Sequence, residues 1–308
     1  MRIDYKILWF EDNKASYNTK KDFIKDIIED FSFNFIEPQN EIDGKNLETL
    51  DYANYDLIIA DMTLSGGVTA MTLMEAIRKK SIFTEVLFYS SDGEEAVRAE
   101  LAKHSIDGAY CSGRDNEDFE YKAKEVIRTL IKKTQDLTNM RGLVMAEVSE
   151  LDHMMEEIII RYFTDPHGKT ILERESLFKE IMDRFDEDYR NNLKKTDDKC
   201  SKKCIHKIRD KSIAEIVSSL FFESYKKART IDKIIKTEGI DVENFLDNYK
   251  KEIIDIRNLL AHCESKKIDG KEVLVTKKGN EEIFDDNKFI DIRRNIIKYH
   301  KVFQNLKF

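Results

Sequence analysis

Short apolar runs alternate with amphipathic segments over residues 1–135. The apolar runs have the length and composition of buried strands, and they cover residues 5–10, 31–36, 56–60, 85–89 and 108–111. The segments between them carry apolar residues at helical spacing, near residues 17–30, 70–80, 93–104 and 117–133. Strands that alternate with helices predict an α/β domain with a doubly wound, five-stranded parallel sheet. Ligands of such sheets bind beyond the carboxyl ends of the strands.

The pattern changes after residue 136, where long segments with apolar residues at helical spacing dominate. These segments lie near residues 170–190, 205–236, 242–263 and 287–305. Two short runs, at 271–276 and 281–284 around Lys278-Gly279-Asn280, indicate a β-hairpin. This half is therefore predicted to be an all-α helical bundle with a short β-hairpin. The length of 308 residues fits two domains, at 1–135 and 136–308.

Residues 117–163 connect the two predicted domains. They contain no proline and a single glycine, Gly142, and their apolar residues recur at helical spacing. Two consecutive helices, or one nearly continuous helix, should therefore lead from the first domain into the second. A stiff helical connector can carry a displacement that a Gly/Ser linker would absorb.

Composition narrows the class of protein. A hydrophobic content of 41% in 308 residues is enough to bury a sizeable core. No apolar run approaches the roughly 18 to 20 residues that span a bilayer, and the first residues lack the apolar core of a signal peptide. We therefore expect a soluble, cytoplasmic protein with no membrane partner. The cysteines are too few and too scattered for a disulfide framework, which fits a reducing compartment; they are Cys111, Cys200, Cys204 and Cys263.

The formal net charge of −8 is unevenly distributed, with −9 over residues 1–136 and +1 over residues 137–308. Neither part is basic enough to predict tight, sequence-independent binding of nucleic acid. Residues 191–211 are a local exception, with a net charge of +5. This segment is either a solvated loop or a surface that steers RNA, and the composition favours the loop.

Polar residues follow several of the predicted strands in the first domain. Glu11 and Asp12 come directly after the first strand, Asp61 follows the third, and Ser90 follows the fourth. Carboxylates at neighbouring strand ends can converge on a divalent cation, and hard oxygen ligands of this kind suit Mg²⁺.

Residues 61–67, with the sequence DMTLSGG, are similar to the D-x-x-L-P-G turn of two-component receiver domains. The resemblance covers about 135 residues and implies a flavodoxin-like fold. It also implies that Asp61 is a phosphoacceptor, that Ser90 senses the phosphoryl group, and that a histidine kinase or another phosphodonor acts upstream. The Mg²⁺ ligands implied by the resemblance are Glu11, Asp12, Asp61 and the backbone carbonyl of Thr63.

One position departs from the receiver pattern. Ser112 stands after the fifth predicted strand, where receivers carry a Lys that neutralises the acyl phosphate. Arg114 lies two residues further on and could take this role, although a guanidinium fork and an ammonium are not interchangeable. The alternative is a degenerate receiver that serves as a dimerisation or docking scaffold.

A candidate chemistry for the second domain lies near the end of the segment 242–263, in Arg257-Asn258-Leu259-Leu260-Ala261-His262. Asn258 and His262 are one helical turn apart on the polar side of the predicted helix. Arg257 is about 140° around an ideal helix from His262, so the two converge within one chain only if the long Arg257 side chain folds across or the helix ends at His262. Two copies that meet in a dimer would also bring them together. The apolar stripe predicted to face the core consists of Tyr249, Ile253, Ile256, Leu260 and Cys263.

This segment resembles the R-x4-6-H motif of HEPN-superfamily ribonucleases. A His with a pKa near neutrality suits proton transfer, and an Arg suits the charge of a phosphorane. We therefore assign His262 as general acid/base, Arg257 as transition-state stabiliser and Asn258 as an orienting or phosphate-contacting group. The resemblance implies metal-independent endoribonuclease cleavage of RNA by 2′-hydroxyl attack, 2′,3′-cyclic phosphate products, a composite site in a homodimer, and a stress or defence role.

Alternatives remain for this motif. Residues 294–300 also fit the R-x4-6-H spacing, although they match the family pattern less well. Arg257 could instead pair with a helix carboxylate while His262 caps a helix carboxyl end. The main rival to the regulated nuclease is a non-enzymatic response regulator whose helical output domain binds a protein or nucleic-acid partner.

Two further groups of residues are weaker candidates for a functional site. Cys200, Cys204 and His206 are closely spaced, but free thiols are favoured because a second ligand pair at zinc-finger spacing is lacking. His153 could exchange phosphoryl groups with Asp61, although a surface or core-edge histidine is the commoner case.

Overall fold

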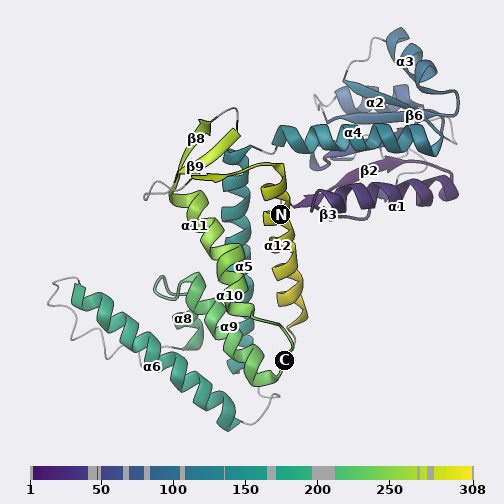
Figure 1. Cartoon of the computed structure of the whole chain (residues 1–308). Helices are drawn as coiled ribbons and strands as arrows, with labels where there is room; N and C mark the ends of the chain where they lie inside the picture. The colour runs from purple at the N-terminus through teal and green to yellow at the C-terminus, as the bar shows by residue number, and fades with distance from the viewer. Residues whose placement is uncertain are drawn as a thin grey trace. The chain divides into compact units, whose positions relative to one another are not determined.

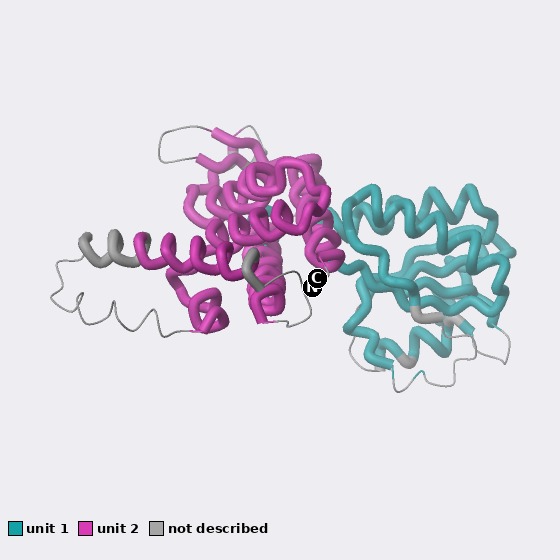
Figure 2. Tube along the Cα trace, turned by 90° about the horizontal axis from the view of Figure 1, so that it is seen from below, with its two compact units in different colours: residues 1–139 teal, residues 140–308 magenta. Residues whose placement is uncertain are grey.

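The computed structural model describes the backbone of most of the chain, namely residues 3–40, 47, 50–64, 69–79, 84–104, 108–134, 136–164, 171–195, 212–268, 271–275 and 281–306. The chain divides into two compact units, Met1–Asn139 and Met140–Phe308 (Figure 2). The boundary falls in the first turn of α5 (Leu137–Thr164), close to the predicted position at residue 135. The first unit is mixed α/β and the second is mainly helical (Figure 1).

Unit 1 contains a five-stranded parallel sheet in the order β4-β2-β5-β6-β7. Two short strands, β1 (Asp4–Tyr5) and β3 (Asn34–Phe35), form a separate parallel pair. The strands of the larger sheet are β2 (Ile7–Phe10), β4 (Gln39–Asn40), β5 (Leu57–Asp61), β6 (Val86–Ser90) and β7 (Ala109–Gly113).

The predicted first and second strands differ from those observed. The first is interrupted at Lys6, whose N–H donates to Asp56 Oδ2 at 2.8 Å and whose carbonyl accepts from the Asp56 N–H at 2.9 Å. The predicted second strand, residues 31–36, contributes only the short pair with β1. The edge of the five-stranded sheet is instead β4, beyond Pro38. Strand pairing depends on contacts between residues that are far apart in the sequence. The local apolar pattern therefore predicted the second strand of the sheet at residues 31–36, before its observed position at β4.

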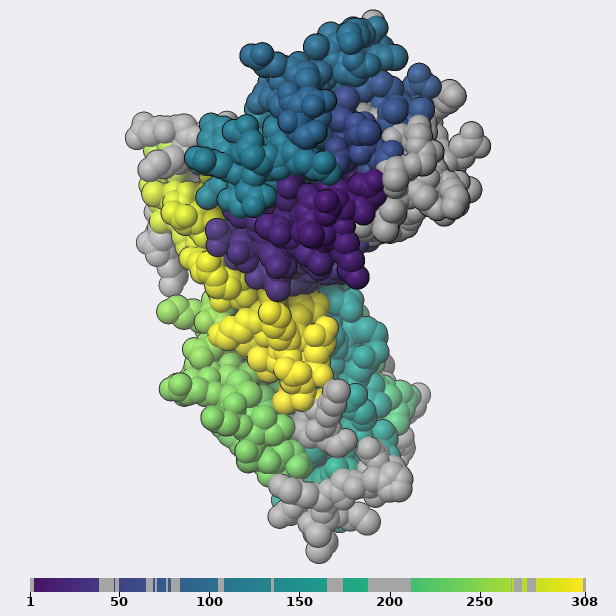
Figure 3. Space-filling model, turned by 90° about the vertical axis from the view of Figure 1, so that its right-hand side faces the viewer, coloured from purple at the N-terminus to yellow at the C-terminus, as the bar shows by residue number. Residues whose placement is uncertain are grey.

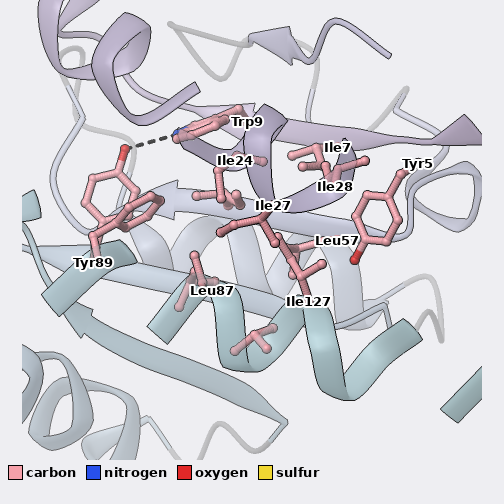
Figure 4. Close-up of a cluster of buried hydrophobic side chains, with 14 of the residues drawn as sticks. Tyr5, Ile7, Trp9, Ile24, Ile27, Ile28, Leu57, Leu87, Tyr89 and Ile127 are labelled. Carbon is pink, nitrogen blue, oxygen red and sulfur yellow. Dashed lines mark hydrogen bonds between the residues drawn. The ribbon is translucent and has the colours of Figure 1, made fainter. Parts of the chain in front are cut away.

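Side chains alternate between the two faces of the sheet, and each face has its own apolar core. Trp9, Ile59 and Leu87 face one core, where α1 (Lys14–Asp30) and α4 (Asn116–Thr134) supply the packing residues. Figure 4 shows this cluster, including the hydrogen bond from Trp9 Nε1 to the Tyr89 hydroxyl at 3.1 Å. The other core is covered by α2 (Ala70–Lys79) and α3 (Glu94–Lys103), with a short 3₁₀ turn, η1 (Tyr52–Asn54), at its edge.

Unit 2 is a helical assembly with a small antiparallel sheet in the order β10-β9-β8. Its long helices are α5, α6 (Ile171–Lys195), α9 (Ser224–Glu238) and α12 (Asp286–Asn305). The shorter elements are α8 (Ile213–Val217), α10 (Phe245–Tyr249), the π-helical stretch η3 (Lys250–Ile254), α11 (Asp255–His262), β8 (Glu264–Ile268), β9 (Lys271–Val275) and β10 (Glu281–Ile283).

The helical unit departs from the sequence prediction in two places. The predicted helix 205–236 is not continuous, because α8 starts at the Ser212 capping box and ends before the turn that leads into α9. The predicted hairpin is a three-stranded sheet, since β8 also pairs with β9. The β8 sequence ESKKI has no alternation of apolar and polar residues, so no pattern marked it as a strand. The connector consists of two helices, α4 and α5, as one of the two predicted alternatives stated.

The predicted helix 242–263 is interrupted by η3. A π-helical turn is wider than an α-helical turn, so it shifts the phase of the residues that follow. Ile253 and Ile254 are both buried, whereas Ile256 and Cys263 of the predicted stripe are only half-buried. The predicted stripe is therefore right for Tyr249, Ile253 and Leu260 and wrong for the other two.

Helix α12 contacts both α5 and η3. Lys298 Nζ lies 2.8 Å from Glu252 Oε2 in η3, and His300 Nε2 lies 3.0 Å from Glu147 Oε2 in α5. On the face shown in Figure 3, α12 (yellow) lies between green residues of α9 and α10 and teal residues of α5. In the part of the chain that the structure describes, no helix is both long and apolar enough to cross a bilayer.

Candidate functional site

Three carboxylates meet at one edge of the parallel sheet in unit 1. Glu11 and Asp12 follow β2, and Asp61 ends β5, the strand that pairs with β2. One carboxylate oxygen from each of the three residues lies within 4.8 Å of the others. Glu11 and Asp61 are 0% and 3% exposed. A compact set of oxygen donors fits a hard divalent cation such as Mg²⁺, so the predicted ligand residues are brought together.

The Glu11 carboxylate is held in place by two neighbours. Its Oε2 accepts a hydrogen bond from the Tyr89 hydroxyl at 2.9 Å, and that hydroxyl accepts from Trp9 Nε1 at 3.1 Å. Its Oε1 accepts from the Asn13 N–H at 2.8 Å. Such supporting bonds orient a ligand before the cation arrives. The chain from Trp9 through Tyr89 to Glu11 therefore joins the apolar core to the acidic pocket.

Arg114 supplies positive charge to this pocket. Its Nη2 lies 2.5 Å from Asp61 Oδ2 and 3.4 Å from Glu11 Oε1, so a single guanidinium bridges two carboxylates. Ser112 is buried and its hydroxyl donates to the Gly113 carbonyl at 3.0 Å. Arg114, and not Ser112, is therefore the residue of this segment that faces the acidic cluster.

Lys20 is a second cation close to the pocket, and sequence reasoning missed it. It lies on α1, is 5% exposed, and its Nζ donates to Ser16 Oγ at 3.2 Å. The Nζ is also 5.6 Å from the ring centroid of Tyr89 and 5.4 Å from that of Phe119. Burial lowers the pKa of Lys20, and the charge of Glu11 opposes this shift. A lysine within the apolar stripe of a helix was the signal that could have identified it.

The surroundings of Asp61 act on its pKa in opposite directions. Burial raises its pKa, while the charge of Arg114 and a hydrogen bond from the Thr63 N–H, at 3.3 Å from Asp61 Oδ1, lower it. Thr63 also forms a bridge with Thr69, and residues 65–67 of the predicted turn lie outside the described residues. Because burial disfavours the ionised form of the Asp61 carboxyl group, a bound cation would stabilise that form.

Ser90 ends β6 at the same edge of the sheet. Its neighbour Tyr89 is in register with Asp61, and Ser90 is in register with Gly113, which precedes Arg114. Ser90 is 7% exposed, and its hydroxyl accepts from the Asp92 N–H at 3.1 Å. The predicted sensing residue is thus next to the acidic pocket, with its hydroxyl engaged in the turn that follows the strand.

In unit 2, Arg257 points into the helical assembly. Its Nη2 donates to Ser224 Oγ at 3.2 Å, and Ser224 in turn donates to Asp152 Oδ2. Lys227 and Glu156 form an ion pair of 2.5 Å beside them. Helices α5, α9 and α11 therefore meet at a polar network, and neither Ser224 nor the role of Asp152 was predicted from the sequence.

The other two motif residues lie on the exposed side of α11. Asn258 and His262 are exposed, one turn apart, and His262 is the last residue of the helix. Among the described contacts, none joins Arg257 to His262. The structure therefore brings Asn258 and His262 to one surface and directs Arg257 elsewhere, as the angle of about 140° on an ideal helix predicts.

The network around Arg257 is incompletely satisfied. Among the described residues, Asp152 Oδ1, Arg257 Nε and the Tyr249 hydroxyl are buried atoms without a hydrogen-bond partner. Burial raises the pKa of Asp152, while the Ser224 hydrogen bond and the charges of Lys227 and Arg257 lower it.

The second R-x4-6-H match is engaged in structural contacts. Arg294 pairs with Asp291 at 2.7 Å on the exposed face of α12, and His300 lies 3.0 Å from the buried carboxylate of Glu147. His153 is exposed and lies 3.4 Å from Glu157, as expected of a surface histidine. Cys200, Cys204 and His206 lie outside the described residues, as does most of the basic segment 191–211.

Comparisons with known proteins give little further information. No protein-family model and no curated protein matches the chain. A solved structure of a fusion that contains a yeast trimeric coiled-coil segment is similar at 21% identity, over 42% of this chain and 77% of that chain, with a TM-score of 0.30. A likeness of this extent carries no argument about fold or function.

Proposed function

We propose that the chain is a receiver-regulated, metal-independent endoribonuclease. Unit 1 would be a doubly wound receiver domain whose phosphoacceptor is Asp61, and unit 2 a HEPN-like effector that cuts RNA in a homodimer. The observation that carries the proposal is the convergence of Glu11, Asp12 and Asp61 within 4.8 Å, with Arg114 against two of them. The sheet order β4-β2-β5-β6-β7, with helices on both faces, supports the receiver assignment.

The residues of unit 1 have separate roles in this proposal. A bound Mg²⁺ would neutralise charge on the incoming phosphoryl group. Asp61 would attack the phosphorus as the bond between that phosphorus and the donor breaks, so the donor leaves without its phosphoryl group, while Glu11, Asp12 and the Thr63 carbonyl would hold the cation. Arg114 contacts the phosphoryl oxygens in place of the Lys that Ser112 replaces, because its guanidinium already reaches Asp61. Ser90 donates to the phosphoryl group and so reports the state of Asp61, which a histidine kinase or another phosphodonor sets.

The residues of unit 2 would cut RNA by 2′-hydroxyl attack. The 2′-oxygen bonds to phosphorus as the bond from phosphorus to the 5′-oxygen breaks, and His262 takes the 2′-hydroxyl proton and gives a proton to that leaving oxygen. Asn258 orients the phosphate, and Arg257 stabilises the negative charge of the transition state. His262 and Asn258 are already on the surface, which supports their access to a large substrate. Arg257 reaches the same phosphate when it leaves Ser224 or when it belongs to a second subunit. The reaction needs no metal or other cofactor.

A second candidate function is favoured by one observation. Arg257 donates to Ser224 within a network that includes Asp152, so it already has a structural role inside the subunit. In a non-enzymatic response regulator, this network would hold α11 in place, and the helical unit would bind a protein or nucleic-acid partner.

Cleavage of RNA by the purified full chain separates the two candidates. We expect His262→Ala to lower the cleavage rate by at least about 100-fold, because general acid/base catalysis contributes that much. His104→Ala is the matched control, since it removes an exposed histidine from unit 1. Equal rates for the wild type and both variants on several RNAs would exclude the nuclease and leave the non-enzymatic regulator.

A phosphoryl mimic tests unit 1 independently. We expect BeF₃⁻ to bind the wild type in the presence of Mg²⁺ and not the Asp61→Ala variant, as read by fluorine NMR. Asp22→Ala, which removes a carboxylate from the surface of α1, is the control and should bind as the wild type does. Binding that survives Asp61→Ala would contradict the phosphoacceptor assignment.

A further inference from the structure

A groove with a cavity volume of about 40 Å³ lies between α6 and α9 in unit 2, away from the Arg257 network. Helix α6 contributes Arg184 and Phe185, the turn before α9 contributes Phe222, and α9 contributes Lys226, Arg229 and Lys233. Figure 1 shows α6, α8 and α9 at the same end of the unit.

Packing and charge contacts hold the two walls of the groove together. The rings of Phe185 and Phe222 have centroids 6.0 Å apart, and these two lining residues form the apolar floor of the groove. Glu180 on α6 forms an ion pair with Lys233 on α9 and lies 3.4 Å from Arg184. The groove is therefore formed by packed side chains from both helices.

The charge of the groove is strongly positive. Its lining residues, so far as the structure describes them, include four cations and no carboxylate. Glu180 lies next to the lining and offsets two of those cations, Arg184 and Lys233. Lys226 Nζ donates to the neutral carbonyl of Phe221 at 2.8 Å. A groove of this kind is complementary to an anion that also carries apolar surface.

Exposed aromatic side chains adjoin the groove. Phe221 and Tyr225, which flank lining residues Phe222 and Lys226 in the chain, are 45% and 41% exposed. Large exposed rings beside cations are typical of surfaces that bind single-stranded nucleic acid, because each base can stack on a ring while the phosphates meet the cations.

We propose that the groove between α6 and α9 binds single-stranded RNA. Phosphates contact Lys226 and Arg229, and a nucleobase lies over the apolar floor. The inference rests on the proposed function for its substrate class, and it adds where unit 2 holds the strand. Ser224, which contacts Arg257, and Lys226 are two residues apart on α9, so they point to nearly opposite faces of that helix, and the groove is on a different face of α9 from the Arg257 network.

The test measures binding without cleavage. A fluorescent 2′-O-methyl oligouridine of about 12 nucleotides has no free 2′-hydroxyl, so it cannot be cut by the proposed chemistry, and anisotropy reports its binding to the full chain. We compare the wild type with Lys226→Gln/Arg229→Gln. The control is Lys124→Gln/Lys132→Gln, which removes the same charge from exposed positions of α4 in unit 1.

We expect the groove variant to bind at least about 5-fold more weakly, and its salt dependence to fall by about 1.4 in the slope of log K against log salt, because two phosphate contacts are lost. The control should stay within about 2-fold of the wild type. A charge-preserving variant, Lys226→Arg/Arg229→Lys, should retain binding, which excludes misfolding as the cause of the loss.

Two results would overturn the proposal. The first is equal binding by the groove variant and the control. The second is competition by inorganic polyphosphate as effective as competition by unlabelled oligouridine, because the groove would then recognise charge alone. Cleavage of unmodified RNA is measured separately. Binding in the groove with no cleavage would sink the nuclease while leaving this inference intact.

Discussion

The acidic pocket of unit 1 and the Arg257–His262 motif of unit 2 assemble in opposite ways. Glu11 and Asp61 are far apart in the sequence but lie together, because adjacent parallel strands end at one edge of the sheet. Arg257 and His262 are close in the sequence, yet they leave the helix about 140° apart. A shared sheet edge is therefore a better guide to a site than close spacing on a helix.

The difference also has a functional consequence. The pocket is complete within one chain, with three carboxylates and Arg114 in contact range. The motif is not, because Arg257 contacts Ser224 while Asn258 and His262 face solvent. We therefore expect unit 1 to bind its cation as a monomer and unit 2 to act only as a dimer or after Arg257 is released.

The largest effect is expected from removing Arg257, which tests whether the motif of unit 2 is catalytic. We expect Arg257→Ala to lower RNA cleavage by about 100- to 1,000-fold, which is the usual effect of removing a group that stabilises transition-state charge. Arg294→Ala is the matched control, because it belongs to the other R-x4-6-H match and pairs only at the surface with Asp291 among its described ion pairs. An equal loss in both variants, measured as initial rates, would show that the motif assignment is wrong.

The second prediction concerns the link between the core and the pocket. Tyr89→Phe removes the hydroxyl that donates to Glu11 and accepts from Trp9. We expect the free energy of unfolding to fall by about 1–3 kcal/mol, because two buried polar groups lose a partner. Urea denaturation of unit 1 followed by Trp9 fluorescence measures this change. Tyr121→Phe, at an exposed position of α4, should change it by less than about 0.5 kcal/mol; a comparable loss there would refute the proposed link.

The third prediction concerns Arg114, which occupies the carboxylates that a cation would need. We expect Arg114→Gln to bind Mg²⁺ alone up to about 5-fold more tightly, because a competing partly exposed ion pair is removed. The same variant should bind BeF₃⁻ more weakly, since the guanidinium no longer contacts the phosphoryl oxygens. Calorimetry and fluorine NMR measure the two effects, and Arg98→Gln on α3 is the control. If Arg114→Gln changed the affinities for Mg²⁺ and for BeF₃⁻ in the same direction, the proposed contact between Arg114 and the phosphoryl group would be contradicted.

The smallest expected effect is a pH dependence in unit 2. Burial raises the pKa of Asp152, and a carboxyl with a raised folded pKa loses stability as the pH rises through that value. Asp152→Asn cannot ionise, so the wild type should lose stability relative to the variant as the pH rises above about 4, the ordinary pKa of an aspartate. Urea midpoints at several pH values test this. A difference that stays constant over the whole range would show that Asp152 is not the titrating group.

Much of unit 1 could be predicted because its elements obey local rules. Buried apolar runs marked β5, β6 and β7, and the polar residues at strand ends identified Glu11, Asp12, Asp61 and Ser90. The position of β4 depends on its pairing with Leu8 and Trp9 of β2, which no local pattern contains. The pocket's second cation, Lys20, was likewise unforeseen, since its surroundings come from α1, α4 and the sheet.

Unit 2 was predicted less completely. The positions of its long helices followed from helical spacing, but the π-helical turn in η3 shifted the buried face in a way that regular periodicity cannot express. Ser224 and Asp152 contact Arg257 from two other helices, so their role depends on tertiary packing. Sequence spacing identified the residues of the motif but not the direction in which each one points.

Mixing two inactive variants tests the central claim most directly. Arg257→Ala and His262→Ala each lack one group of the composite site, and a mixed dimer regains one intact site from the two subunits. If subunits exchange at random, the mixture should recover about a quarter of the wild-type cleavage rate. A mixture that stays as inactive as each variant alone, although mixed dimers form, would contradict a catalytic site shared between subunits.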